Sequence, residues 1–272
     1  MILAAGEALV DCFPGAGGFR PRPGGAPYNW ARGLARLGVR AGFSGVLSSD
    51  GFGERLLGGL AEDGVAFLGE RSQAPTPIAL VEGERFRFYH RGTALMAPIP
   101  LPPARAYLLG SLALQLGRVG WPAEGYRALD PNVRPGLTPE DFRTRFLRLA
   151  AFADLVKLSE EDAAWLFGDP EGLARRLARR TPLVVLTRGD RGAVAFLGET
   201  RIEVPAVPAR VRDPTGAGDA FFAALVAGLD RRGALVPGRP PEPEIARAAL
   251  EEAARAAART VEVLGALPPR RG

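Results

Sequence analysis

The stretch VRDPTGAGDAFFAAL, residues 211–225, places small residues and a carboxylate where a loop turns into a helix. Gly216, Ala217 and Gly218 let the backbone come close to a ligand, and the first amides of a helix have no partner within it. With the positive end of the helix dipole, these amides predict an anion site. Asp219, in the first turn, could take a proton from a hydroxyl that attacks a bound phosphate. The stretch therefore indicates phosphoryl transfer to an alcohol, and an N-capped helix after a glycine turn is the alternative.

Three reactive residue types occur only once each, which limits the chemistry available to this chain. They are Cys12, His90 and Lys157. This inventory excludes a disulfide within the chain and a zinc site of the usual kind. Lys157 follows Val156 rather than glycine, and no Gly-x-Ser-x-Gly sequence occurs, so a Walker A loop and a nucleophile elbow are both absent. A nucleotide would have to bind through backbone amides at residues 216–219.

Charge and hydropathy indicate the expected partners, location and domain number of the protein rather than its activity. The formal net charge is +5, but the arginines are scattered along expected helices, which predicts solvated faces rather than a nucleic-acid surface. No run of about 18 apolar residues occurs, and Gly6 and Glu7 directly follow the short apolar start, unlike in a signal peptide. We expect a cytoplasmic protein with no nucleic-acid or membrane partner. With 47% apolar residues the chain can bury a large core, so one domain over residues 1–272 is expected.

Short apolar strands alternate with helices along the chain, which predicts an α/β fold with a mainly parallel, doubly wound sheet. Hairpins are expected at 11–22 and 78–89, the second turning around 82–84. The crossover between 110 and 130 is short and predicts little more than a turn at 121–123, so this region is expected to pack differently or to be covered by a second subunit. Strands are predicted at 2–10, 41–46, 106–109, 126–129, 155–158 and 183–187, and helices at 26–37 and 53–62.

A second glycine-rich segment, GGAPYNWARGLARLG at residues 24–38, precedes the 213–219 segment by roughly 190 residues. The two segments together resemble the two signatures of the ribokinase-type (PfkB) carbohydrate kinases. This resemblance runs along almost the whole chain and is greatest to the fructokinase and 2-keto-3-deoxygluconate kinase members. It implies a ribokinase-like three-layer α/β/α fold. A small β lid would be formed by about 11–23 and 76–97.

The first signature and the strand before it supply expected sugar ligands. By resemblance, Asp11 hydrogen-bonds sugar hydroxyls; a turn before Pro14 is its alternative role. Gly24 and Gly25 would let the backbone approach the sugar. Asn29 could offer both a donor and an acceptor to a hydroxyl, or act as a local cap.

Two further segments add candidate substrate ligands. The Asp-Pro-Asn-Val-Arg sequence at 130–134 is similar to a segment of fructokinase-like members, and it implies that Asn132 and Arg134 contact the substrate. Arg134 could stabilise the transferring phosphoryl group or hold an acidic sugar, although the segment is also a good turn. Relatives often have an arginine after a Phe-Tyr pair, where this chain has His90 and then Arg91. Either could serve the sugar, and a solvated hairpin position is the alternative for each.

Expected nucleotide and metal residues follow the later strands. Lys157 and Ser159 belong to a segment that occupies the place of the family's Asn-x-x-Glu motif, which helps organise Mg²⁺ through water. Asp162 stands where that motif has glutamate, but the segment also reads as a Ser-capped helix start.

The loop after residues 183–187 resembles the family's loop near the nucleotide phosphates. It would bring Thr187, Gly189 and Gly192 to the nucleotide, together with Gly216 and Gly218. Taken alone, it is an ordinary hairpin turn. Asp213 would lie near a site for a monovalent cation such as K⁺, which some relatives use.

The resemblance implies a kinase that uses ATP and Mg²⁺ and transfers the γ-phosphoryl group to a primary sugar hydroxyl, with fructose as the expected acceptor. Asp219 would act as the general base. 2-Keto-3-deoxygluconate is the alternative acceptor. A nucleoside kinase fits less well, because no aromatic clamp for a base is evident, and a sugar or nucleotide sensor would not need the base. A homodimer formed through the lids is also implied.

Overall fold

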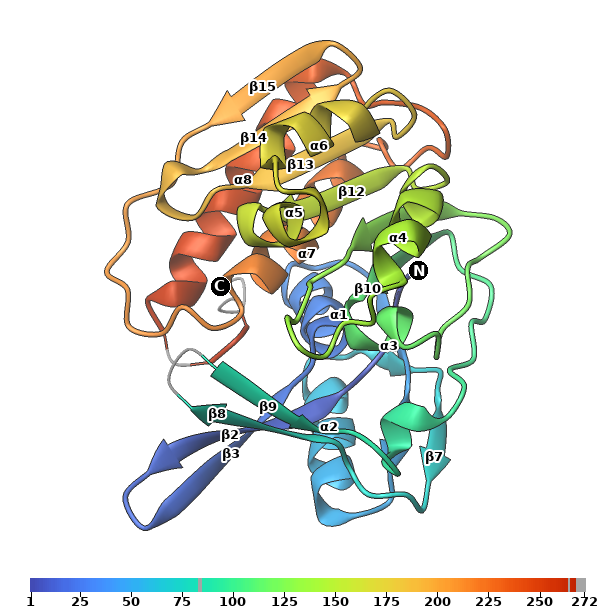
Figure 1. Ribbon diagram of the computed structural model, residues 1–272, viewed down its shortest axis with the longest axis vertical. Helices are drawn as coiled ribbons and strands as arrows, with labels where there is room; N and C mark the ends of the chain where they lie inside the picture. The colour runs from blue at the N-terminus through green and yellow to red at the C-terminus, as the bar shows by residue number, and fades with distance from the viewer. Residues whose placement is uncertain (83–84, 264, 268–272) are drawn as a thin grey trace.

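The computed structural model describes residues 1–82, 85–263 and 265–267 (Figure 1). Within these residues, nine strands form a central sheet in which β14 and β15 run antiparallel to their neighbours and the other pairs are parallel. In spatial order the strands are β15 (Thr200–Val204), β14 (Ala193–Leu197), β13 (Leu183–Thr187), β12 (Leu155–Ser159), β11 (Tyr126–Asp130), β10 (Ala106–Gly110), β1 (Ile2–Ala5), β4 (Ala41–Ser44) and β6 (Ala66–Phe67).

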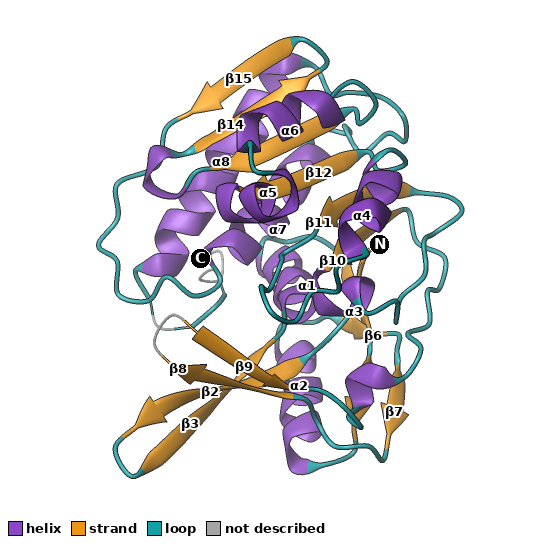
Figure 2. Cartoon of the chain, in the orientation of Figure 1, coloured by secondary structure: helices purple, strands orange, loops and turns teal. Residues whose placement is uncertain are grey.

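Helices cover both faces of this sheet and bury one apolar core on each side (Figure 2). One face carries α1 (Ala26–Arg36), α2 (Gly51–Glu62), α7 (Ala217–Arg231) and α8 (Pro243–Val261). The other carries α3 (Ser111–Gln115), α4 (Phe142–Ala150), α5 (Glu160–Phe167) and α6 (Pro170–Leu177). Single 3₁₀ turns occur at η1 (Ala94–Met96) and η2 (Gly189–Arg191). The predicted three-layer α/β/α fold is confirmed.

A second, four-stranded sheet lies across one end of the central sheet in Figure 1. We call it the small sheet; its order is β3 (Gly18–Gly24), β2 (Leu9–Gly15), β8 (Ile78–Glu82) and β9 (Arg85–Tyr89). The predicted hairpins form it, but the turn expected at 82–84 falls partly on residues 83–84, outside the described residues. Two short strands, β5 (Val46–Ser48) and β7 (Glu70–Ser72), pair separately.

The strand predicted at 2–10 is in fact two strands in two different sheets. The backbone leaves β1 at Gly6, whose φ is +157°, and enters the small sheet at Leu9. A Cβ atom at Gly6 would overlap the ring of Pro27 at the start of α1. The apolar residues on both sides of Gly6 and Glu7 did not reveal this break, because both strands are buried.

The short crossover also differs from the prediction. β10 and β11 pair in parallel, from Ala106 opposite Tyr126 to Gly110 opposite Asp130. The crossover contains the five-residue helix α3, which starts directly after Gly110, and no helix lies at 121–123. Gly110 makes this possible, since a Cβ atom there would overlap the carbonyl oxygen of Asp130.

In the described part of the chain, none of the helices has the length and apolar character needed to cross a bilayer.

Candidate active site

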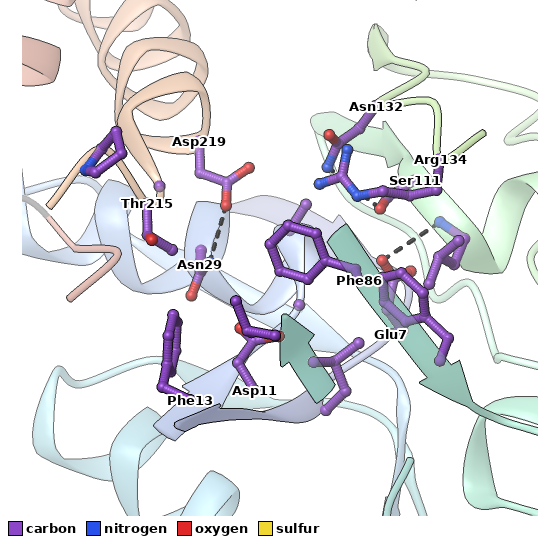
Figure 3. A pocket seen from close by; sticks show the side chains of 18 of the residues that line it. Glu7, Asp11, Phe13, Asn29, Phe86, Ser111, Asn132, Arg134, Thr215 and Asp219 are labelled. Carbon is purple, nitrogen blue, oxygen red and sulfur yellow. Dashed lines mark hydrogen bonds between the residues drawn. The ribbon is translucent and has the colours of Figure 1, made fainter. Parts of the chain in front are cut away.

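A cavity of about 670 Å³ lies between the carboxyl ends of the central strands and the small sheet (Figure 3). Parallel strands bring their carboxyl ends to one edge, where open α/β sheets collect ligands. Segments from both ends of the chain meet there. The predicted site residues that line the cavity are Asp11, Gly25, Asn29, Asn132, Arg134, Asp213, Gly216 and Asp219.

The predicted anion loop leads into helix α7. Gly216 is the N-cap residue and has a left-handed backbone with φ of +79°, which favours glycine. As a glycine it has no side chain to cap the helix, so the helix is not side-chain capped. The Ala217 N–H turns back to the Pro214 carbonyl at 3.3 Å, and thus contributes less to an anion site than expected. The amides that follow it belong to the open first turn of the helix.

Asp219 lies in this first turn with both carboxylate oxygens bonded to helix α1. Asn29 Nδ2 donates to Oδ2 at 2.8 Å (Figure 3), and Trp30 Nε1 donates to Oδ1 at 2.9 Å. Burial raises the pKa of Asp219, while Asn29, Lys157 and Arg134 act in the opposite direction. A raised pKa makes a carboxylate a better proton acceptor near neutral pH.

Asn29 offers the cavity an unused acceptor. A carboxylate only accepts, so the amide must turn Nδ2 toward Asp219 and leave Oδ1 free. Among the described residues, this Oδ1 is buried and has no hydrogen-bond partner. A buried acceptor of this kind is costly unless a ligand satisfies it.

Asp11 faces Asp219 from β2 (Figure 3). Burial raises its pKa to about 7, with Arg134 acting to lower it and Asp219 adding to the rise. Gly24 and Gly25 let β2 and the start of α1 pack closely together. A Cβ atom at Gly24 would overlap the Asp11 carboxylate, and one at Gly25 would lie 2.7 Å from the Glu7 carbonyl oxygen.

The opposite wall contains two residues with left-handed backbones, Ser111 with φ of +53° and Asn132 with φ of +43°. Asn132 Nδ2 lies 3.4 Å from Ser111 Oγ. Behind them the Glu7 carboxylate accepts the Leu112 and Ala113 amides at 3.3 and 2.9 Å. Sequence reasoning missed Glu7 and Ser111, although both directly follow a glycine at the end of a strand. Strained backbones of this kind gather at ligand sites.

Aromatic side chains complete the cavity: Phe13, Phe86 and Phe88 line it. His90 and Arg91 do not, contrary to the expectation that either could contact the sugar. Phe86 and Phe88 share one face of β9 because successive strand residues alternate, and β9 ends at Tyr89, so His90 and Arg91 belong to the segment after the strand. The cavity thus has aromatic rings in its wall, although the sequence showed no evident aromatic clamp.

Lys157 lies behind the anion loop rather than in the cavity. Its Nζ donates to Asp130 Oδ2 at 3.0 Å, and a Cβ atom at Gly218 would be 3.4 Å from it. Asp130 and Lys157 are both almost fully buried. Lys157 is therefore placed to act on charge bound at residues 216–219.

The expected metal residue Asp162 has its carboxylate engaged elsewhere. It accepts the Val133 amide at 2.6 Å and the Ser159 amide at 3.1 Å, while Ser159 Oγ accepts the Asp162 amide at 3.0 Å. This is a capping box, and it also fixes the loop that carries Arg134. The structure therefore favours the capping alternative for Ser159 and Asp162. The described residues contain no group of three or more acidic, histidine or cysteine side chains suited to a metal.

The remaining nucleotide candidates lie at the same sheet edge but outside the cavity. Thr187 is paired in register with Ser159 at the ends of β13 and β12. Gly189 and Gly192 have positive φ around the following turn, and a Cβ atom at Gly192 would overlap the β15 backbone at Val204. For Gly192, close packing is thus a sufficient reason for glycine.

Asp213 is an ion-pair partner of the small sheet. Its Oδ2 accepts Arg22 Nη1 at 3.0 Å and the Gly265 amide at 3.2 Å, and Oδ1 accepts the Thr215 amide at 3.0 Å. These hydrogen bonds lower the pKa of Asp213 against the effect of its burial. A monovalent cation at this carboxylate would have to compete with the guanidinium of Arg22. The sequence alone did not indicate this ion pair.

Comparison with known proteins assigns this geometry to a family. The model of the pfkB family of carbohydrate kinases matches residues 12–108 and 122–269. A fructokinase of Klebsiella pneumoniae is 37% identical over 265 residues, covering 85% of each chain. A fructokinase of Rhizobium leguminosarum bv. trifolii is 35% identical over 262 residues, covering 84% of this chain and 79% of that protein.

Solved structures agree. A fructokinase of Vibrio cholerae O395 with fructose, ADP and calcium bound has a TM-score of 0.83 and 26% identity, covering 98% of this chain and 94% of its own. A fructokinase of Xylella fastidiosa with bound ATP has a TM-score of 0.84 and 28% identity, covering 98% and 95%. The protein is a phosphotransferase that acts on a sugar hydroxyl, and it belongs to the pfkB family of carbohydrate kinases.

Proposed function

We propose that this kinase is an ATP-dependent fructokinase, which transfers the γ-phosphoryl group of ATP to a primary hydroxyl of fructose. The proposal draws on the fructokinase names of relatives that match most of the chain. The observation that carries it is the arrangement around Asp219. A proton acceptor, an unpartnered amide oxygen on Asn29 and the open start of α7 all meet at one cavity.

In the proposed reaction, Asp219 accepts the proton of the primary hydroxyl while that oxygen attacks the γ-phosphorus in line. The new oxygen–phosphorus bond forms as the bond to the ADP oxygen breaks, and ADP leaves with that electron pair. The first amides of α7 stabilise charge on the phosphoryl oxygens. Asn29 Oδ1 and Asp11 hold other hydroxyls of the sugar, so that the attacking oxygen is positioned between Asp219 and the anion loop.

We propose that ATP binds at the anion loop and that its phosphates, rather than a preformed protein site, hold the cation. ATP would extend from the anion loop toward the ends of β12 and β13, with Lys157 adding positive charge behind the phosphates. Mg²⁺ commonly binds through substrate phosphates and water with few protein carboxylates. The engaged oxygens of Asp162 do not fit a direct metal ligand. We propose that Mg²⁺ enters with ATP.

A second acceptor is favoured by one observation, the position of Arg134. Its guanidinium belongs to the cavity wall and lies over the Phe86 ring with 6.0 Å between the central carbon and the ring centroid. The positive charge of this guanidinium would suit the carboxylate of an acidic sugar such as 2-keto-3-deoxygluconate.

An ADP-coupled assay with fructose, 2-keto-3-deoxygluconate, ribose and adenosine tests the proposal. We expect turnover with fructose, and a fall of about 10²- to 10⁴-fold in kcat for Asp219→Asn. Glu199→Gln, in the exposed turn between β14 and β15, is the surface control and should keep wild-type kcat. Normal turnover in Asp219→Asn would remove Asp219 from the mechanism, and preference for another acceptor would replace fructose.

We further propose that the kinase is a cytoplasmic homodimer joined through the small sheets. The supporting observation is that Phe19 on β3 and Tyr89 on β9 are 55% and 53% exposed. Light scattering tests this, because a monomer has a mass of 28.8 kDa and a dimer twice that.

A further inference from the structure

Trp30 is placed against the proposed general base in a way that packing alone does not require. Its Nε1–H donates to Asp219 Oδ1 at 2.9 Å, although the two residues are 189 positions apart. The side chain is fully buried. An indole has one polar hydrogen, and leaving it buried without a partner costs free energy. That partner is the carboxylate proposed to take the substrate's proton.

Two parts of the core pack against the indole ring. Its centroid lies 5.1 Å from that of Phe222 with an interplanar angle of 76°, an edge-to-face contact. At the other end, a Cβ atom at Gly110 would lie 3.2 Å from the ring, so the end of β10 limits its movement. These contacts favour the ring orientation in which Nε1 points at Asp219.

Two donors from adjacent residues of α1 hold the two oxygens of one carboxylate. Asn29 bonds Oδ2 and Trp30 bonds Oδ1, so rotation of the carboxylate plane would break one or both bonds. Each oxygen keeps a second lone pair for a hydroxyl in the cavity. The hydrogen bond from Trp30 also stabilises the ionised form against the burial that raises the pKa of Asp219.

We propose that Trp30 is a positioning residue for the phosphoryl-transfer reaction, which fixes the carboxylate plane of Asp219 and stabilises its negative charge through the Nε1 hydrogen bond. This inference rests on the proposed role of Asp219 as general base. The other charged groups whose fields reach Asp219 are Asp11 on the small sheet, Asp130 and Lys157 in the central sheet, and Arg134 beside them.

The first test is the pH profile of kcat/KM for Trp30→Phe, which removes the N–H group and keeps an aromatic ring. Loss of a donor to the ionised form should move the acid limb to higher pH by about one unit. We expect kcat on the plateau to fall roughly tenfold, through loss of orientation, with KM for the sugar and ATP within about threefold of wild type.

Phe222→Leu is the matched control, because it disturbs the packing of the same indole ring and leaves the hydrogen bond in place. It should lower the melting temperature without moving the acid limb. Equal pH profiles for wild type and Trp30→Phe, or equal shifts in Trp30→Phe and Phe222→Leu, would overturn the proposal.

A measurement on the unsubstituted protein keeps the test decisive if Trp30→Phe does not fold. In protein with ¹⁵N-labelled tryptophan, the chain gives three indole signals. One should titrate with the acid limb of kcat/KM, and Asp219→Asn should abolish this titration. Three indole shifts that are independent of pH would refute the inference. If Asp219→Asn remains active, the proposed general base is wrong. If it is inactive while Trp30→Phe keeps the wild-type pH profile, only the role of Trp30 is wrong.

Discussion

Replacing Gly216 by alanine should damage both the fold and the proposed anion loop. The residue has φ of +79°, a conformation that costs an alanine roughly 1–2 kcal/mol. The new Cβ would also lie 2.5 Å from the Cβ of Ala266 and overlap its Cα and carbonyl oxygen. Overpacking of this kind adds roughly 1–3 kcal/mol. Together we expect the free energy of unfolding to fall by roughly 2–5 kcal/mol.

The overlap can be relieved only by moving the start of α7 or residues 265–267. Either movement would displace the first amides of the helix, so kcat should fall by about 10²- to 10³-fold, the usual effect of losing one such donor. Urea unfolding and the ADP-coupled assay measure the two effects.

Gly64→Ala is the matched control for backbone strain. Gly64 also has a positive φ, +70°, but its Cβ would meet nothing within 4 Å. It should lose only the roughly 1–2 kcal/mol of the left-handed backbone and keep wild-type kcat. If Gly216→Ala resembles Gly64→Ala in both measurements, the reasoning about the loop is refuted.

Three further predictions concern charges. Asp130→Asn and Lys157→Met should each lower the free energy of unfolding by about 3–5 kcal/mol, because each leaves a buried charge without its partner. The double variant should recover most of this loss. Additive losses in urea unfolding would contradict the prediction. The pKa of Asp11 is raised to about 7 in the folded protein. Between pH 4 and 7 the folded protein therefore holds a proton that the unfolded chain has released. The contribution of Asp11 to the free energy of unfolding should fall as pH rises from 4 to 7 and then level off. The difference in melting temperature between Asp11→Asn and wild type should therefore grow in favour of the variant up to pH 7, and a pH-independent difference would count against it. Arg22→Gln removes the guanidinium from Asp213, so KCl should stimulate this variant more than wild type, with choline chloride as the ionic-strength control; equal responses would argue against competition at Asp213.

Local patterns were sufficient to predict most elements of the central sheet. Residues 183–186 form an apolar run that Thr187 ends, and β13 covers 183–187 as predicted. Helix α1 ends one residue before the predicted limit. The anion loop and its carboxylate were also predictable, because glycines before an apolar helix have a local physical meaning.

The contacts that organise the site had no such local signal. Trp30 meets Asp219 across 189 residues, and Arg22 meets Asp213 across 191. A sequence taken alone gives no distance between such segments. The expectation for His90 and Arg91 failed for a related reason, since the sequence did not show that β9 ends at Tyr89, before either residue reaches the cavity. Asp162 was ambiguous because the same spacing suits a cap and a ligand.

The burial of the chain's single lysine makes amine chemistry a probe of its core. Lys157 has a side chain only 6% exposed, and its neighbours Asp130 and Asp162 raise its pKa, so the amine is both shielded and protonated. An acylating reagent can reach it only after the sheet edge behind the anion loop has opened. The rate at which residue 157 is acylated therefore reports how often that edge opens, and a ligand that closes the cavity should slow the reaction.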